Sequence, residues 1–211
     1  MGGPVEAAQA LLGARLVRAD ATGRRVGRIV EVEAYDGPTD QASHARFGRT
    51  ARNAVMFGPA GRAYVYLVYG MYDCLNVVSG TDGAAAAVLV RAVEPLEGID
   101  LMRADRDRVT RDRRRTPRPA PVHGRAVRDA RVASGPGLVG AAFGLDRSWT
   151  GFDLCDPGSP LRLEAAAIGE AETLVSSSRI GIGYAGEPWA SLPWRFAIAG
   201  HRSVSGGRSP R

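Results

Sequence analysis

The sequence contains no lysine, and all 28 of its basic side chains are arginine. Without a side-chain amine, the chain has only its α-amino group with which to form a Schiff base, so lysine-dependent imine chemistry is excluded. The richness in Ala, Gly, Arg and Pro is typical of a GC-rich genome, which accounts for most of this bias. The chemical consequence is the same whatever its origin.

Cysteine and histidine are also scarce. Cys74 and Cys155 lie far apart and form no CxxC pair, which favours a reducing, cytosolic setting. The three histidines show no ligand spacing, so no metal site is predicted. No run of about 18 apolar residues could span a membrane, and the N-terminus lacks the pattern of a signal peptide. We therefore expect a cytoplasmic protein.

The charge is positive and unevenly distributed. The net charge is +6 and the pI is close to 10.0, which suits a polyanionic partner. Residues 103–131 hold 11 Arg and 4 Asp, so the remainder of the chain is nearly neutral. This stretch is either a solvated, partly disordered insertion or an arm that follows phosphates. Basicity alone does not identify a nucleic-acid-binding protein.

Hydrophobic periodicity predicts a single mixed α/β domain. Hairpin-length links outnumber βαβ units, so we expect an α+β fold with a mainly antiparallel, curved sheet, flanking helices and a protruding hairpin that bears tyrosines. We place the domain at 1–204, with the basic insertion at about 104–131 and a flexible tail at 205–211. Helices are predicted at 4–12, from 96 onward and after 134–137. Strands are predicted at 14–20, 25–35, on both sides of a bend near Gly70, at 84–95, within 152–165 and beyond 182.

The predicted strand RIVEVEAY, residues 28–35, carries two carboxylates and a phenol in one row. Strict alternation gives two sets that face opposite ways: Ile29, Glu31, Glu33 and Tyr35, and Val30, Val32 and Ala34. The row is either the solvated face of an edge strand or a pair in which one carboxylate is a general base for water. Arg91, in the buried-looking strand VLVRAVEP, is expected to pair with this row.

Four tyrosines gather in the predicted hairpin AYVYLVYGMYDCLN. Tyr64 and Tyr66 share one strand face, and Tyr69 and Tyr72 flank the bend. The tyrosines either pack the core and the hairpin, or one ring projects as a wedge that unstacks a duplex while others stack on an extruded base.

Two polar residues elsewhere are further candidates. His44 lies in a long polar loop with several arginines, a length that favours function over simple connection. On its own, however, a histidine in such a loop is more often a hydrogen-bonded loop residue than a catalyst. Asn76 lies among apolar strand residues and needs a partner or a substrate edge to contact.

Several blocks in order resemble the alkyladenine (3-methyladenine) DNA glycosylase family. They span about residue 10 to residue 200 and read RIVEVEAYDGPTDQASH, GRTARNAVMFGPAGRAYVYLVYGMYDCLN, VLVRAVEPLEG, SGPGL and RIGIGYAGEPW. The resemblance implies one mixed α/β domain that uses no metal or cofactor. The Arg-rich stretch between VLVRAVEPLEG and SGPGL is longer and more basic than is usual in this family, so no role transfers to it.

The resemblance also implies a role for each matching position. Glu33 would position and deprotonate the attacking water, and Arg91 would help to hold that water and the carboxylate. Tyr35, His44 and Tyr66 would stack on the flipped base. Asn76 would meet the exocyclic amino group of guanine and so discriminate against that base.

Further positions are implied to contact the DNA itself. Tyr69 would fill the space that the flipped nucleotide vacates, and Met71 lies beside it in the same bend. Other implied DNA contacts are Arg49, Arg52, Ser134 and Gly135.

The function that follows is a monofunctional DNA glycosylase that initiates base excision repair. It would act as a monomer on duplex DNA containing alkylated or deaminated purines, in the cytoplasm at the nucleoid. One alternative is a protein of the same fold that recognises lesions without excising them. A second is a hydrolase of free nucleosides, for which Tyr69 and the basic surface would be superfluous.

Overall fold

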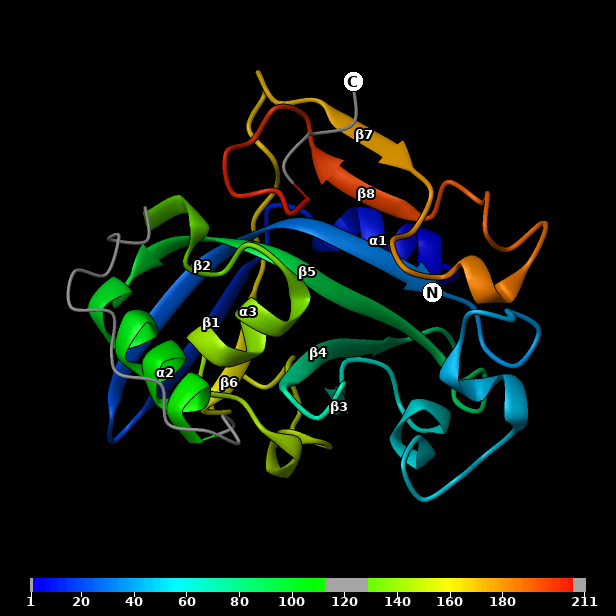
Figure 1. The fold of residues 1–211 in the computed structure, drawn as a ribbon, viewed down its shortest axis with the longest axis horizontal. Coiled ribbons are helices and arrows are strands. Elements are labelled where there is room, and N and C mark those ends of the chain that lie inside the picture. The colour runs from blue at the N-terminus through cyan, green and yellow to red at the C-terminus, as the bar shows by residue number, and fades with distance from the viewer. Residues whose placement is uncertain (1, 113–128, 207–211) are drawn as a thin grey trace.

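The computed structural model describes residues 2–112 and 129–206, and within them eight strands form one sheet. The strands are β1 (Arg15–Asp20), β2 (Gly23–Tyr35), β3 (Ala63–Val68), β4 (Tyr72–Ser79), β5 (Ala86–Glu97), β6 (Leu161–Glu164), β7 (Leu174–Ser177) and β8 (Arg195–Ile198). The helices are α1 (Pro4–Leu11), α2 (Ile99–Asp112) and α3 (Pro136–Ala142). Figure 1 shows the long strands β2 and β5 crossing the centre of the molecule.

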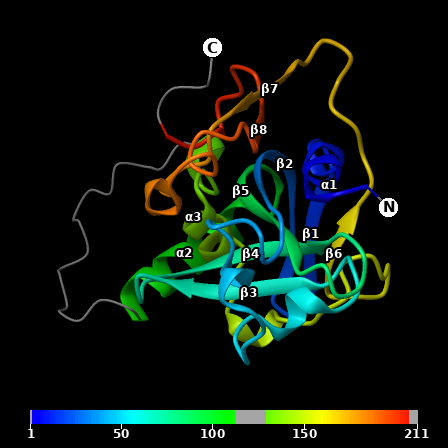
Figure 2. The same cartoon turned by 90° about the vertical axis from the view of Figure 1, so that its right-hand side faces the viewer.

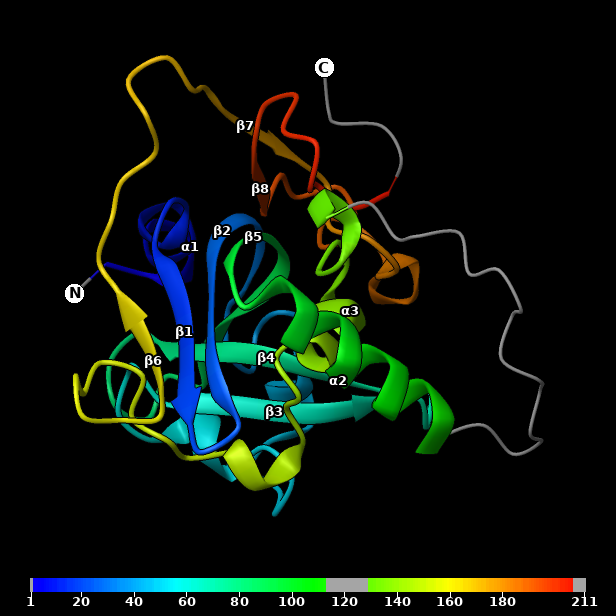
Figure 3. The same ribbon diagram turned by 90° about the vertical axis from the view of Figure 1, so that its left-hand side faces the viewer.

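The sheet is antiparallel and strongly curled. Its main path runs β3-β4-β5-β2-β1-β6, and β8 joins β2 to β7. β2 pairs with β1 along its first half and with β8 at residues 31–33, while β5 lies on its other side. Figures 2 and 3 show β3 and β4 running across the direction of β1 and β6, so the sheet curls. The expected single mixed α/β domain with a mainly antiparallel curved sheet is confirmed.

A β-bulge interrupts the alternation that the sequence predicts in β2. The register of β2 against β5 shifts between Ile29 and Glu31. Ile29 consequently packs in the main core with Val32 and Ala34, whereas Val30 joins a separate cluster against β8. The prediction that Ile29 faces the same way as the glutamates is therefore wrong, because a bulge adds one residue to the strand and reverses the faces upstream of it.

Small residues let α3 pack closely on β4. A Cβ atom added at Gly140 would lie 1.9 Å from the carbonyl oxygen of Asp73, so only glycine fits there. The backbone N–H of Gly135, just before α3, donates to the carbonyl oxygen of Arg91 at 3.0 Å. α3 and the turn before it thus hold β4 and the middle of β5 in place.

The element predictions agree with the structure except near the C-terminus and in the basic stretch. The sequence does not predict β7, because its four residues of mixed polarity carry no clear period. α2 continues helically to Asp112, and a short 3-10 helix covers Asp129–Arg131. Residues 113–128, between these two ends of the basic stretch, lie outside the described residues. Ser205, which the sequence assigned to the tail, is buried. Residues 207–211 of that tail also lie outside the described residues.

Candidate active site

Glu31 is held by four donors from three distant segments. Its side chain is fully buried and its Oε1 accepts from Arg91 Nε and Arg195 Nε, both at 2.8 Å. The Ser205 hydroxyl donates to Oε1 at 2.9 Å and the Ser205 N–H donates to Oε2 at 2.6 Å. Burial alone would raise the pKa of Glu31, but Arg91, the Ser205 N–H and Arg195 outweigh it and hold that pKa below its ordinary value.

Glu33, two residues along, is also fully buried but has different partners. The N–H of Ile180 donates to its Oε1 at 2.7 Å, and the hydroxyl of Tyr35 donates to its Oε2 at 2.9 Å. Arg91 Nη1 lies 3.2 Å from the same Oε2. Glu33 is therefore the member of the pair that contacts Tyr35, and Arg91 bridges the two carboxylates.

The buried carboxylates decide between the two interpretations of the acidic row. Burial would lower the pKa of Arg91, but Glu33 and Glu31 outweigh it and raise that pKa, so the guanidinium is permanently charged. The predicted pairing of Arg91 with this row is confirmed. The solvated edge strand is excluded, because β2 has strand neighbours on both sides and neither glutamate reaches solvent.

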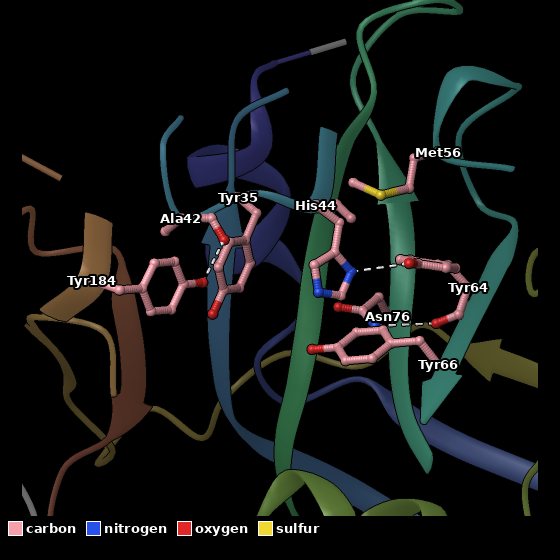
Figure 4. Close-up of a pocket in the computed structure, with 9 residues that line it drawn as sticks. Tyr35, Ala42, His44, Met56, Tyr64, Tyr66, Asn76 and Tyr184 are labelled. Carbon is pink, nitrogen blue, oxygen red and sulfur yellow. Dashed lines mark hydrogen bonds between the residues drawn. The ribbon is translucent and has the colours of Figure 1, made fainter. Parts of the chain in front are cut away.

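Beside Glu33 lies an aromatic pocket with about 360 Å³ of empty space, part of it open to solvent. Four residues assigned to base binding from the resemblance, Tyr35, His44, Tyr66 and Asn76, all line it. In Figure 4, Tyr35 and Tyr184 lie on one side of the pocket and the other labelled rings face them. The full lining is Tyr35, Ala42, His44, Met56, Tyr64, Tyr66, Asn76, Ala87 and Tyr184.

Three rings of the aromatic pocket, those of His44, Tyr66 and Tyr35, are electrically neutral at physiological pH. Burial lowers the pKa of His44 to about 4, and the positive charges of Arg52 and Arg46 act in the same direction. Burial also raises the pKa of Tyr66, and it raises that of Tyr35 together with the charge of Glu33. His44 and Tyr66 meet edge to face, with ring centroids 4.4 Å apart. The pocket thus offers neutral aromatic surfaces, and Tyr35 connects them to the buried carboxyl group of Glu33.

The pKa of His44 predicts how stability depends on pH. In the unfolded chain this pKa returns toward 6.5, so between pH 4 and pH 6.5 the unfolded chain binds more protons than the folded protein. The contribution of neutral His44 to the free energy of unfolding is complete above pH 6.5 and is lost as the pH falls toward 4. Between pH 7 and pH 5 we expect wild type to lose at most about 2 kcal/mol more unfolding free energy than His44→Asn, as measured by urea denaturation.

A matched control for this slope is Tyr64→Phe. It removes the hydrogen bond that joins Tyr64 OH and His44 Nδ1 at 2.9 Å, yet it leaves the imidazole buried. Because burial is the main cause of the lowered pKa, this variant should keep the wild-type slope. Equal slopes for wild type and His44→Asn would refute the assignment.

Asn76 is fixed by the backbone. It is buried, and its Nδ2 donates to the carbonyl oxygens of Tyr64, at 3.1 Å, and Cys74, at 3.4 Å. The expected need of this residue for a partner is thereby met from the protein. Its amide oxygen is the group that remains to meet a ligand in the pocket.

Several pocket and network residues were not predicted from the sequence. Tyr184 is 64% exposed, its hydroxyl donates to the carbonyl oxygen of Ala42 at 3.1 Å, and Arg46 lies over its ring. It stands in the block RIGIGYAGEPW, and its position there as an isolated aromatic residue among glycines was the available signal. The sequence around Arg195 and Ser205 gives no signal of a role in this site, because no local pattern links either residue to Glu31.

The residues proposed to contact DNA lie outside the aromatic pocket. Tyr69 is 88% exposed in the turn between β3 and β4, with φ of 51°, which is uncommon for a side chain of its size. The alternative of a core tyrosine is therefore wrong for Tyr69. Met71, in the same turn, is 50% exposed, and Arg49 is exposed in the loop after His44.

Arg52 and Ser134 each have contacts within the protein. Arg52 lies over the ring of pocket residue Tyr66 and donates to the carbonyl oxygen of Leu67 at 3.3 Å. The Ser134 hydroxyl accepts from Arg131 at 3.0 Å and donates to the carbonyl oxygen of Val204 at 3.4 Å. Both therefore link the surface to the buried elements behind it.

A neutral aromatic pocket next to a buried carboxyl group is suited to bind a flat ring and to hold it beside an acid–base group. Among the described residues no group of three His, Cys, Asp or Glu side chains could hold a metal ion, and no helix is long and apolar enough to cross a membrane.

Comparison with known proteins identifies the family. The family model for methylpurine-DNA glycosylase matches residues 2–202, and the chain belongs to that family. It is 44% identical over 192 residues to a protein of Methanocella arvoryzae that is assigned as a 3-methyladenine DNA glycosylase. The aligned region covers 91% of this chain and 86% of the Methanocella protein. It is also 44% identical over 209 residues to DNA-3-methyladenine glycosylase of Mus musculus, which covers 95% of this chain and 58% of the mouse protein. The resemblance stated from the sequence is confirmed, and so is the class of enzyme, a hydrolase of N-glycosyl bonds in the repair of alkylated DNA.

Proposed function

We propose that this protein flips alkylated or deaminated purines out of duplex DNA and hydrolyses their N-glycosidic bond with a water activated by Glu33. The observation that carries the proposal is the hydrogen bond between buried Glu33 and Tyr35, which joins a carboxylate to the wall of the aromatic pocket. The four donors on Glu31 leave that residue a structural role. Glu33 is thus the carboxylate available for chemistry at the pocket.

In the proposed reaction a water attacks C1′ of the flipped nucleotide. Glu33 accepts a proton from that water as the C1′–O bond forms, and the N-glycosidic bond breaks with its electron pair passing to the base. Arg91 holds the Glu33 carboxylate in place during the transfer. A purine alkylated on N3 or N7 carries positive charge and leaves as a neutral base, so it needs no further activation by the protein.

The aromatic pocket suits a cationic purine in particular. Tyrosine faces attract a cation, and the neutral imidazole of His44 does not repel one. A normal purine is neutral, stacked and paired, so its extrusion costs more and gains less in the pocket. The Asn76 amide would meet the purine edge and, as the resemblance implies, discriminate against guanine, by crowding its exocyclic amino group rather than by hydrogen bonding to it.

The absence of lysine gives the proposed reaction a defined product. No side-chain amine can attack the sugar to form an imine, so the DNA strand should remain intact at an abasic site.

We further propose that the protein acts as a monomer without a cofactor on chromosomal DNA in the cytoplasm. The residues proposed to contact the duplex are Arg49, Arg52, Met71, Ser134 and Gly135.

Base release from two substrates tests the proposed function. Purified protein is incubated with a duplex containing a methylated purine and, separately, with the free methylated nucleoside, and the released base is quantified. We expect rapid release from the duplex and little from the nucleoside. Tight binding of the duplex without release would favour the lesion-recognising alternative, and equal release from both would favour a nucleoside hydrolase.

Tyr69→Ala should weaken excision from duplex DNA while leaving the fold intact. Unstacking a nucleotide costs a few kcal/mol, and a ring that fills the resulting gap offsets a large part of that cost. If Tyr69 is that ring, the variant loses this compensation. Single-stranded DNA has no such gap, so the defect should be selective for duplex. The measurement is the single-turnover rate on the same lesion in both substrates.

The melting temperature and a control variant complete this test. Tyr69 is 88% exposed, so the melting temperature should stay near that of wild type. Leu96→Ala removes another exposed apolar side chain, 46% exposed and located in β5, and should have no effect on either rate. Equal defects of Tyr69→Ala on both substrates would rule out the wedge.

A further inference from the structure

Arg179 lies between β7 and β8 and forms a fully buried ion pair with Asp40. Both side chains have 0% exposure, and two nitrogens of the guanidinium contact the two oxygens of Asp40 at 2.5 and 3.0 Å. The same guanidinium donates to the carbonyl oxygens of Ala34, at 2.9 Å, and Trp189, at 3.3 Å. Arg179 thus joins the end of β2, the loop after it and the C-terminal segment.

Arg179 also contacts the wall of the aromatic pocket. Its guanidinium carbon lies 4.7 Å from the ring centroid of Tyr35 and 5.1 Å from that of Trp194. A planar guanidinium stacked on an aromatic face restricts how that ring can turn. The position of the Tyr35 ring therefore depends on Arg179.

The two protein donors other than Arg91 that hold Glu33 both depend on this arginine. Ile180, the next residue in the chain, donates its N–H to Oε1 at 2.7 Å, and Tyr35, under the guanidinium, donates its hydroxyl to Oε2 at 2.9 Å. A carboxylate that must accept a proton from water needs a fixed orientation, because small displacements of a catalytic group are costly. Apart from Arg91, Glu33 has one donor on each oxygen, and Arg179 adjoins both donors.

We infer that Arg179 is a positioning residue for excision, which orients Glu33 through the Ile180 N–H and the Tyr35 hydroxyl. The inference rests on the proposed function of Glu33. Asp40 extends the same role to the pocket rim, because it also accepts from the backbone N–H groups of Asp36 and Ala42, at 3.2 and 2.9 Å, and thereby holds the loop that leads to His44.

The test compares Arg179 with an arginine of similar burial that lies away from Glu33. Arg25 of β2 pairs with Asp105 of α2 at 2.6 Å, and its side chain is 3% exposed. Arg179→Gln and Arg25→Gln should both lower the melting temperature. Single-turnover excision from a duplex containing a methylated purine is then measured at a temperature at which circular dichroism shows each variant folded, and across a range of pH.

We expect Arg179→Gln to reduce the single-turnover rate by about tenfold or more and Arg25→Gln to leave it near wild type. The pH dependence of that rate should also differ from wild type in Arg179→Gln, because the donors that orient the Glu33 side chain are misplaced. A purely structural role would change neither quantity. The titratable and charged groups around Glu33 are Glu31, Tyr35, Tyr66, Arg91, Arg179 and Arg195, and only Arg179 is altered.

Arg179→Lys keeps the inference testable if Arg179→Gln does not fold. Lysine retains the charge beside Asp40 but has no flat face for Tyr35. A folded Arg179→Lys protein with the wild-type rate and pH profile would overturn the inference, whereas the same defects in smaller measure would support it. The wild-type reaction is run in parallel, so that failure of the inference about Arg179 can be told from failure of the proposed function. A wild-type protein that releases no base refutes the proposed function itself.

Discussion

Replacement of Glu33 by glutamine should abolish base release and preserve DNA binding. The amide keeps the shape of the side chain and its oxygen can still accept from the Ile180 N–H, but it cannot take a proton from water. A general base contributes roughly 10²–10⁴-fold to a rate, so a loss of that size is expected in single-turnover excision. The dissociation constant for the lesion duplex should change little, since Glu33 is buried behind Tyr35.

The control for this variant is Glu97→Gln. Glu97 lies at the end of β5 and forms an exposed pair with Arg24, so the same chemical change there should leave excision unaltered. Near-wild-type excision by Glu33→Gln would remove Glu33 from the reaction and require another base.

The second large effect is expected on stability. Arg91 and Arg195 both contact the Glu31 carboxylate through their Nε atoms, and Glu31→Gln removes that negative charge. Among the described residues, Arg195 then has no carboxylate partner. Removing one partner of a buried ion pair costs about 3–5 kcal/mol. For a chain of this size that corresponds to a fall of roughly 6–20 °C in melting temperature.

Calorimetry of three variants separates the two glutamates. Glu97→Gln breaks only an exposed pair and should stay within about 1 kcal/mol of wild type. Glu33→Gln should lose less stability than Glu31→Gln, because Arg91 keeps its bond to Glu31. A Glu31→Gln protein as stable as wild type would show that the four-donor network does not hold the C-terminal segment to β2.

The sequence predicted the local parts of this site and missed its long-range supports. Alternation correctly put Glu31, Glu33 and Tyr35 on one face, but it carries no register information and so could not show the bulge at Val30. The pairing of Arg91 was predictable because a buried arginine needs a carboxylate. Arg179, Arg195 and Ser205 reach β2 from far along the chain, and no periodicity or spacing connects residues at that separation.

The resemblance to a family supplied what local patterns could not. His44 and Asn76 looked ordinary in a loop and a strand, and only matched blocks brought them together with Tyr35 and Tyr66, which the aromatic pocket confirms as neighbours. Tyr184 belongs to a matched block, yet no role was assigned to it, and only the fold brings it to the pocket. Residue types and local patterns therefore suggest candidate residues, and the tertiary structure shows which of them lie together.

The most direct test of the account is a crystal structure of the Glu33→Gln variant bound to a duplex that contains a methylated purine. The account predicts that the damaged base lies in the aromatic pocket between Tyr35 and the rings of His44 and Tyr66, with its C1′ facing residue 33 and Tyr69 in the vacated space. A base that stays stacked in the duplex, or one bound elsewhere on the protein with the aromatic pocket empty, would contradict it.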